Sequence, residues 1–167
     1  MPTQQLRVGL VGFGFAGQTF HAPVVSAVPG LELAAVASSQ AEKVLAAWPG
    51  AAVFPDVHSL LAAEPAVDLV VVATPNEAHF PVAKAALEAG RHVVVDKPFT
   101  LNAGQARELA DLARAQGKLV SVYQNRRFDS DYLTLKQLLA EGRVGRPVYF
   151  ESHFDRYRPD VRVRWRE

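Results

Sequence analysis

The stretch that most constrains the fold is a glycine-rich loop near the amino end of the chain. Gly12, Gly14 and Gly17 form a G-x-G-x-x-G motif that directly follows an apolar segment, Leu6–Gly12. Glycines at these places permit a tight turn, a close approach of a ligand to the backbone, and close packing of the next helix on the strand. That helix points its unpaired N–H groups and the positive end of its dipole at the loop. The motif therefore predicts a pyrophosphate site within a βαβ unit, although the same turn can also form without a ligand.

Apolar segments alternate with amphipathic segments along the first 122 residues. Strands that alternate with helices are joined by right-handed crossovers and lie parallel to one another. The sequence therefore predicts an α/β protein with a doubly wound parallel sheet, a Rossmann fold, over residues 1–122. The predicted strands are Leu6–Gly12, Leu31–Ala37, Ala51–Phe54, Val67–Ala73, His92–Val95 and Leu119–Val122.

Local signals predict where helices begin, end or bend. Asn102 followed by Gln105 is typical of a helix start, and Gly117 is placed to end that helix. Pro23 lies inside the first predicted helix, so we expect that helix to end or kink near His21.

The chain changes character near Tyr123. Residues 1–122 carry 8 basic and 10 acidic side chains, whereas residues 123–167 carry 10 and 7. A helix is predicted at Asp129–Glu141, before a run of mixed polar and apolar residues, Pro147–Tyr157, that we expect to be the first strand of a second sheet. A lone strand is not a stable domain. Residues 123–167 are therefore interpreted as a linker helix and the start of an incomplete second α/β domain, for substrate binding or oligomerisation.

Composition excludes several classes of protein. The 167 residues include 18 basic and 17 acidic side chains, so no overall attraction for nucleic acids or acidic membranes is expected. There is no cysteine, and the histidines lack the spacing of metal sites, so no metal is expected. The amino end lacks the pattern of a signal peptide, and no apolar run approaches the roughly 20 residues of a membrane helix. We therefore expect a cytoplasmic protein.

The end of the second predicted strand indicates which dinucleotide is preferred. A fold that binds NAD usually places an Asp or Glu about 20 residues beyond the glycine loop, on the adenosine ribose. Here Ser38 and Ser39 occupy that place and Lys43 follows, so no carboxylate would repel a 2′-phosphate. These residues favour NADP over NAD, although the serines could instead cap the next helix.

Two further motifs follow the fourth and fifth predicted strands: Thr74-Pro75-Asn76-x-x-His79 and Asp96-Lys97-Pro98. With the glycine loop, in this order and spacing, they make the chain resemble the Gfo/Idh/MocA oxidoreductases along essentially its whole length. The stretches 12–23, 121–128 and 156–167 look most like the branch of NADP-dependent scyllo-inositol dehydrogenases.

The resemblance adds contacts to those of the glycine loop. Within that loop Phe13, Phe15 and Ala16 are also expected to contact the cofactor, although the phenylalanines could equally pack in the core. The resemblance implies further cofactor contacts. Thr74, Pro75 and Asn76 would line the nicotinamide ribose, with His79 one helical turn further on; Asn125 would lie near the nicotinamide, and Trp165 and Arg166 would be a pair close to the cofactor.

Lys97 is the predicted catalytic residue and a further cofactor contact. It matches the lysine of the family's E-K-P motif, which contacts the nicotinamide ribose and the substrate hydroxyl and often precedes a cis proline bond. Asp96 stands where the family usually has Glu. A partly desolvated lysine beside a cationic nicotinamide should have a lowered pKa and can exchange the hydroxyl proton. A solvated surface lysine is the alternative.

The resemblance implies an NAD(P)-dependent oxidoreductase that moves a hydride between a nicotinamide cofactor and a sugar or cyclic polyol. The family's second catalytic motif, H-x-x-x-D, is absent; His92 and Asp96 match its spacing but lie on the fifth strand. We therefore expect a chain that is truncated, inactive alone, and part of a homo-oligomer in its full-length form. A non-catalytic dinucleotide-binding module or sensor is the alternative. Nucleic-acid binding by the arginine-rich tail is weaker, because acidic residues dilute that tail.

Overall fold

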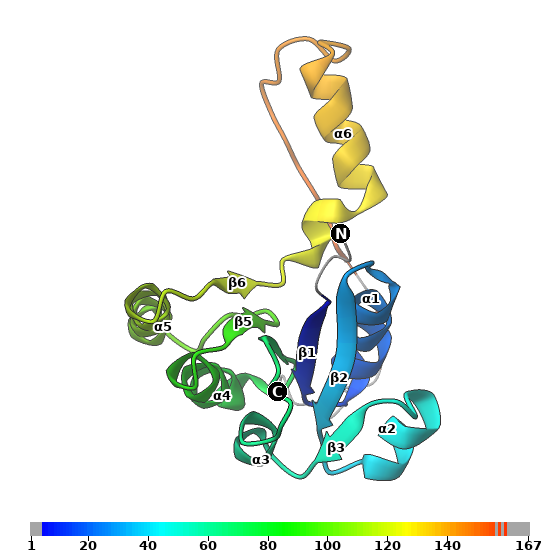
Figure 1. Cartoon of the computed structure of the whole chain (residues 1–167). Helices are drawn as coiled ribbons and strands as arrows, with labels where there is room; N and C mark the ends of the chain where they lie inside the picture. The colour runs from blue at the N-terminus through cyan, green and yellow to red at the C-terminus, as the bar shows by residue number, and fades with distance from the viewer. Residues whose placement is uncertain (1–4, 156, 158, 160–167) are drawn as a thin grey trace. The chain divides into compact units, whose positions relative to one another are not determined.

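The computed structural model describes residues 5–155, 157 and 159, and the chain divides into two compact units between Tyr123 and Gln124. The first unit is built on a six-stranded parallel sheet with the order β3-β2-β1-β4-β5-β6 (Figure 1). This arrangement confirms the predicted doubly wound sheet. The strands are β1 (Leu6–Val11), β2 (Leu31–Ala37), β3 (Ala52–Phe54), β4 (Leu69–Val72), β5 (His92–Val95) and β6 (Val120–Val122).

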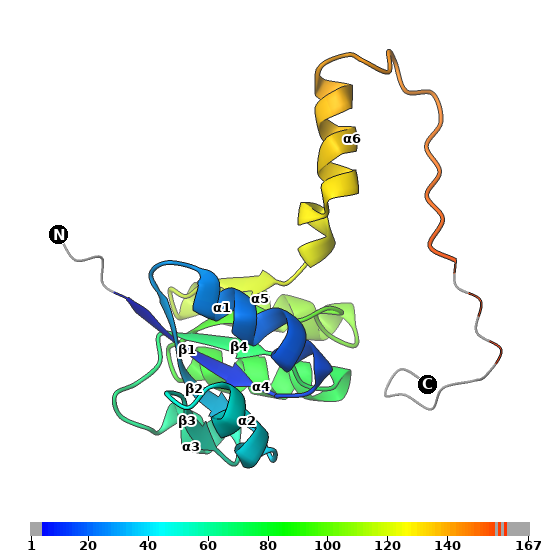
Figure 2. The same ribbon diagram turned by 90° about the vertical axis from the view of Figure 1, so that its right-hand side faces the viewer.

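Helices cover both faces of this sheet, as Figures 1 and 2 show. One face carries two helices, α1 (Ala22–Ala27) and α2 (Ala41–Ala47). The other face carries three helices, α3 (Val57–Leu61), α4 (Asn76–Glu88) and α5 (Ala103–Ala115). Each face has its own apolar core, so the sheet is buried between two layers of helices.

Side chains of the central strands alternate between these two cores. On β4, Val71 packs in the core beneath α1 and α2, whereas Val70 and Val72 pack in the core beneath α3, α4 and α5. All three valines are at most 3% exposed, and a fully buried side chain of this size contributes about 1.5–3 kcal/mol. Burial on both faces explains why this strand is a continuous β-branched run rather than an alternating one.

The predicted start and end of α5 are confirmed. Asn102 Oδ1 accepts a hydrogen bond from the Gln105 amide (3.0 Å), and Gln105 Oε1 accepts one from the Leu101 amide (3.2 Å). After the last turn, Gly117 has a φ of +62°, a conformation that glycine adopts without a steric penalty. Local side-chain chemistry therefore sets both ends of this helix.

The first helix changes form where Pro23 predicts it. A π-helical segment, η1 (Gly17–His21), leads directly into α1, with Pro23 in the first turn of α1. Proline has no N–H to donate to the carbonyl of Thr19, so the regular hydrogen-bond ladder is interrupted here. The change brings His21 into a buried position at the junction.

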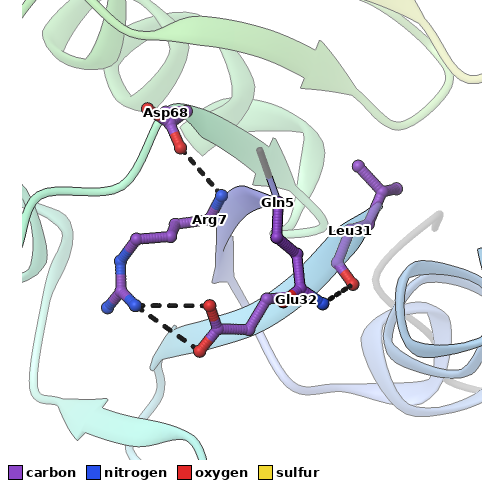
Figure 3. A network of polar contacts seen from close by, with 5 residues as sticks. All are labelled: Gln5, Arg7, Leu31, Glu32 and Asp68. Carbon is purple, nitrogen blue, oxygen red and sulfur yellow. Dashed lines mark hydrogen bonds and ion pairs between the residues drawn. The ribbon is translucent and has the colours of Figure 1, made fainter. Parts of the chain in front are cut away.

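Polar contacts join β1 to both neighbouring strands at the amino end of the sheet (Figure 3). The Arg7 amide donates to Asp68 Oδ2 (2.8 Å), and the Asp68 amide donates back to the Arg7 carbonyl (2.8 Å). The Arg7 guanidinium lies 3.3 Å from Glu32 Oε2 on β2, and Gln5 Nε2 donates to the Leu31 carbonyl (3.2 Å). These contacts hold β1 in place at its amino end, which is the end of the strand opposite the glycine loop.

The second unit contains η2 (Asn125–Phe128), a 3₁₀ helix, and α6 (Ser130–Ala140), which confirms the predicted helix at Asp129–Glu141. The predicted strand at Pro147–Tyr157 is wrong for the residues described, since no strand forms at 147–155 or at 157. A strand requires a neighbour to pair with, and the described part of this unit supplies none. Among the helices of residues 5–155, none is both long enough and apolar enough to cross a membrane.

The cap of α5 can be tested by mutation. Asn102→Ala removes the acceptor of the Gln105 amide and is expected to lower the free energy of unfolding by about 1 kcal/mol. Asn102→Asp keeps a side-chain acceptor and is the matched control, with almost no expected change. Denaturant unfolding followed by circular dichroism measures both variants. An equal loss in the two variants would show that the cap does not stabilise this helix.

Candidate functional site

The three glycines of the loop have different surroundings. Gly12 has a φ of +98°, and a Cβ built there would lie 2.5 Å from the Ala73 carbonyl oxygen. A Cβ at Gly17 would overlap the carbonyl oxygen of Gly12. A Cβ at Gly14, in contrast, would have no neighbouring atom within 4 Å. Gly12 and Gly17 are therefore required by packing within the chain, whereas Gly14 leaves space in which a ligand could approach the backbone.

The two phenylalanines of the loop also differ. Phe13 is 3% exposed and belongs to the core beneath α1 and α2, so core packing accounts for it. Phe15 is 75% exposed, and its ring stacks edge-on against Phe20 at 5.7 Å. Ala16 is partly buried at the start of η1. Gln18, which the motif does not identify, holds the loop by donating from Nε2 to the Phe13 carbonyl (2.7 Å).

The residues predicted to favour NADP follow β2 in a single turn. Ser38 Oγ accepts a hydrogen bond from the Gln40 amide (3.0 Å), and Lys43 Nζ donates to Gln40 Oε1 (2.7 Å). Ser39 and Lys43 are exposed. Gln40 is the residue that precedes the first turn of α2, and no side chain caps that helix, so Ser38 shapes the turn before the helix without capping it. Its hydroxyl proton is still able to donate to a ligand.

Two buried polar atoms lack partners where β4 leads into α4. Thr74 Oγ1 and Asn76 Oδ1 are inaccessible to solvent and have no hydrogen-bond partner among the described residues. Pro75, between them, is exposed and precedes the first residue of α4. A buried polar atom without a partner costs about 1–3 kcal/mol, and such atoms at the carboxyl ends of parallel strands are typical of a ligand site. These residues fit a dinucleotide that supplies the missing partners.

His79 is enclosed rather than directed at a ligand. It is 1% exposed, its Nδ1 lies 2.8 Å from the Pro98 carbonyl oxygen, and its Nε2 lies 3.0 Å from the Thr74 carbonyl oxygen. Both ring nitrogens therefore face backbone acceptors. The expected direct contact of His79 with the cofactor does not agree with this position, because no polar ring atom remains to make it.

Lys97 lies two residues beyond the end of β5, and the neighbouring strand β4 leads into the loop at Thr74. The Asp96 amide donates to the Val72 carbonyl (2.9 Å), which extends the pairing of β5 with β4, and Asp96 Oδ1 accepts from the Lys97 amide (2.8 Å). The Lys97–Pro98 peptide bond is cis, as the resemblance implies. Within the described residues, no hydrogen bond or ion pair involves the Lys97 ammonium group.

Asp96 also belongs to a partly buried cluster that the motifs do not predict. His21 is 3% exposed, and its Nε2 lies 3.5 Å from Asp96 Oδ2, while its ring lies 4.4 Å from the ring of Tyr123. Burial alone would raise the pKa of Asp96, but the contact with His21, the hydrogen bond from the Lys97 amide and the electrostatic effect of both residues hold that pKa below its usual value. Burial, and then the negative charge of Asp96, raise the pKa of Tyr123. The sequence gives little sign of this cluster, because His21, Asp96 and Tyr123 lie far apart in the chain, at η1 and after β5 and β6.

The remaining predicted contacts lie in the second unit. Asn125 is the first residue of η2 and is partly buried. Trp165 and Arg166 lie outside the described residues. Across residues 5–155, no group of three or more His, Asp or Glu side chains is arranged to hold a metal ion.

Comparison with known proteins agrees with the fold described above. Residues 6–124 match the model of the Gfo/Idh/MocA oxidoreductase family with an NAD-binding Rossmann fold. The chain belongs to this family. It is 58% identical over 165 residues to the uncharacterized oxidoreductase YdgJ of Escherichia coli, covering 99% of this chain and 47% of that protein. It is 38% identical over 164 residues to IolW of Bacillus subtilis, a scyllo-inositol 2-dehydrogenase (NADP(+)), covering 97% of this chain and 45% of IolW.

Solved structures of similar proteins show the same arrangement. YPO2259 from Yersinia pestis matches 98% of this chain and 47% of its own, with a TM-score of 0.93 and 57% sequence identity. An oxidoreductase from Bacillus cereus matches 93% of this chain and 45% of its own, with a TM-score of 0.84 and 33% identity. The chain therefore spans about half the length of the relatives that it matches.

The lowered pKa of Asp96 predicts how stability depends on acid. Because the folded pKa lies below the ordinary value of 3.8, ionised Asp96 favours the folded state at higher pH. This contribution is lost as the pH falls through the folded pKa. Asp96→Asn should therefore be less stable than wild type near neutrality and should lose less stability between about pH 5 and pH 3.

Urea unfolding at several pH values measures this difference. Asp111→Asn, which alters an exposed carboxylate of α5, is the control and should follow the wild-type profile. Parallel profiles for wild type and Asp96→Asn would contradict the assignment.

Proposed function

We propose that this chain binds a nicotinamide dinucleotide at the carboxyl edge of its sheet and forms the cofactor half of a dehydrogenase. The observation that carries the proposal is the combination of open space at Gly14 with unpaired, buried oxygens at Thr74 and Asn76. The pyrophosphate would lie against the glycine loop, where backbone N–H groups can donate to it. The nicotinamide ribose would lie at Thr74 and Asn76, whose side chains gain hydrogen-bond partners there.

Lys97 is proposed to handle the proton of the substrate hydroxyl. When bound, the nicotinamide cofactor accepts or donates the hydride. The Lys97 ammonium has no partner among the residues described, so it is available to hydrogen-bond a hydroxyl oxygen and exchange its proton. The Asp96 carboxylate accepts a hydrogen bond from the Lys97 amide and faces His21. It therefore places a negative charge nearby without forming an ion pair with the Lys97 ammonium group.

The preference for NADP is part of this proposal. Ser39 and Lys43 are exposed beside the turn after β2, where a hydroxyl and an ammonium group suit a 2′-phosphate. No carboxylate occupies the end of β2 itself. The name of IolW, a scyllo-inositol 2-dehydrogenase (NADP(+)), supports both this cofactor and a sugar or cyclic polyol as substrate.

The complete protein is proposed to be a cytoplasmic homo-oligomer whose second half supplies the remaining catalytic groups. Relatives about twice as long as this chain support that division. The chain alone is then expected to bind cofactor without oxidising polyols. A non-catalytic dinucleotide-binding module remains the second candidate, which cofactor binding without turnover in the complete protein would favour.

Cofactor binding by the 167-residue chain is the first test. Isothermal titration calorimetry is expected to show NADPH binding about tenfold tighter than NADH, because Lys43 and the serines contact the 2′-phosphate. Gly14→Val should abolish binding without unfolding the chain, since its side chain enters open space.

Gly50→Val is the matched control for this test. Gly50 also has open space around a Cβ position, but it lies between α2 and β3, outside the three loops. Tighter binding of NADH would overturn the NADP preference, and normal binding by Gly14→Val would overturn the position of the pyrophosphate.

The role of Lys97 is testable in the complete protein. Lys97→Ala should lower kcat for polyol oxidation by about a hundredfold or more, with a smaller effect on the Kd of NADPH, because the lysine acts on the substrate proton. Steady-state kinetics and calorimetry separate the two effects. Lys43→Ala is the comparison variant, and it should weaken NADPH binding more than it lowers kcat. An unchanged kcat in Lys97→Ala would remove this residue from the mechanism.

A further inference from the structure

The geometry points to His79 as a positioning residue that holds two loops of the cofactor site together. The first loop, Ala73–Asn76, follows β4, and the second, Asp96–Phe99, follows β5. The inference rests on the proposed function, because it concerns the half of the site assigned above to the nicotinamide ribose. It assigns His79 a role other than contact with the ligand.

The His79 ring lies within hydrogen-bond distance of both loops. Nε2 lies 3.0 Å from the carbonyl oxygen of Thr74, and Nδ1 lies 2.8 Å from the carbonyl oxygen of Pro98. Both distances are those of good N–H···O bonds. A neutral imidazole donates one of these bonds, and an imidazolium donates both.

The position of His79 is itself fixed by the fold. It lies in the first turn of α4, and α4 packs against the sheet through Val82, Ala83 and Ala86, which are at most 9% exposed. The ring is 1% exposed, so solvent cannot readily replace its bonds. A rigid helix therefore holds a buried ring between the two loops, with one ring nitrogen close to a backbone carbonyl on each.

These two loops carry the groups of the proposed nicotinamide subsite. Thr74 and Asn76 bring the unpaired oxygens Oγ1 and Oδ1, and Lys97 brings the ammonium group. The adjacent strands already fix the loops at one point, where the Asp96 amide donates to the Val72 carbonyl (2.9 Å). His79 adds a second point further along each loop, beyond the end of the strand pairing. Two points define the separation and orientation of the loops, whereas one point leaves them able to pivot.

This role predicts a selective loss of affinity. NADPH needs both the adenosine side and the nicotinamide side of the site, whereas 2′,5′-ADP resembles only the adenosine side. His79→Phe, which fills the space but donates no hydrogen bond, should weaken NADPH binding by about tenfold or more. Binding of 2′,5′-ADP should change less than twofold. A general loss of structure would weaken both ligands together.

Two conservative variants and one control sharpen the test. His79→Asn can keep a donor near the Pro98 carbonyl, and His79→Gln can keep one near the Thr74 carbonyl, so both should retain part of the NADPH affinity. His92→Asn is the control, because His92 Nδ1 also contacts backbone, accepting from the Leu119 amide (3.0 Å), but at the amino end of β5. It should bind both ligands as wild type does.

The experiment is a calorimetric titration of the 167-residue chain and these variants with NADPH and with 2′,5′-ADP. Selective loss of NADPH affinity in His79→Phe supports the inference. Equal loss for both ligands, or no loss, overturns it.

A wild-type chain that bound neither ligand would overturn the proposed function instead. The positioning role would then be judged in ligand-free protein from the NMR amide resonances of Asp96, Lys97 and Phe99. Movement of these resonances in His79→Phe but not in His92→Asn would support the role, and unchanged resonances would overturn it.

Discussion

The close approach of the glycine loop to the end of β4 is the constraint on which the site depends. The Gly12 amide donates to the Ala37 carbonyl of β2 (2.9 Å), while the Gly12 Cα lies so near the Ala73 carbonyl that a Cβ would be 2.5 Å from its oxygen. The loop is therefore held between the two neighbours of β1. Any larger side chain at Gly12 would separate β1 from β4, and the carboxyl ends of these strands could no longer form one continuous edge.

That edge gathers groups whose hydrogen-bonding capacity the chain itself does not use. Thr74 Oγ1 and Asn76 Oδ1 are buried without partners among the described residues, and each such atom costs stability of about 1–3 kcal/mol. At the amino end of the same sheet the Arg7 amide is paired with Asp68 and the Arg7 guanidinium with Glu32, although the buried Nε atoms of Arg7 and Arg91 also lack a partner among the described residues. The unpaired atoms at the carboxyl edge differ in being oxygens on the same edge as the glycine loop, where a ligand can satisfy them.

Sequence patterns predicted the parts of the structure that depend on local chemistry. The strands, the Asn102 cap and the change of helix at Pro23 follow from residues that lie close together in the chain. The strand expected at Pro147–Tyr157 did not form in the described residues, because strand formation needs a partner that no local pattern supplies. For the same reason the sequence did not predict that His79 would face the Pro98 carbonyl or that His21 would face Asp96, since each pair joins different elements. The motifs were placed after the fourth and fifth strands, where the structure has them, but tertiary packing decides which side chains face outward.

The aspartate that precedes Lys97 shows how a small departure from a motif can matter. One methylene shorter than the glutamate usual in the family, Asp96 bonds the amide of the next residue and faces the buried His21 ring. Its carboxylate is thereby directed back toward η1, and its pKa is held low. The Lys97 ammonium feels this negative charge without being paired with it, so its hydrogen bonds are left for other groups. In the proposed function, a carboxylate that faces His21 and the Lys97 amide leaves the Lys97 ammonium available to a substrate hydroxyl.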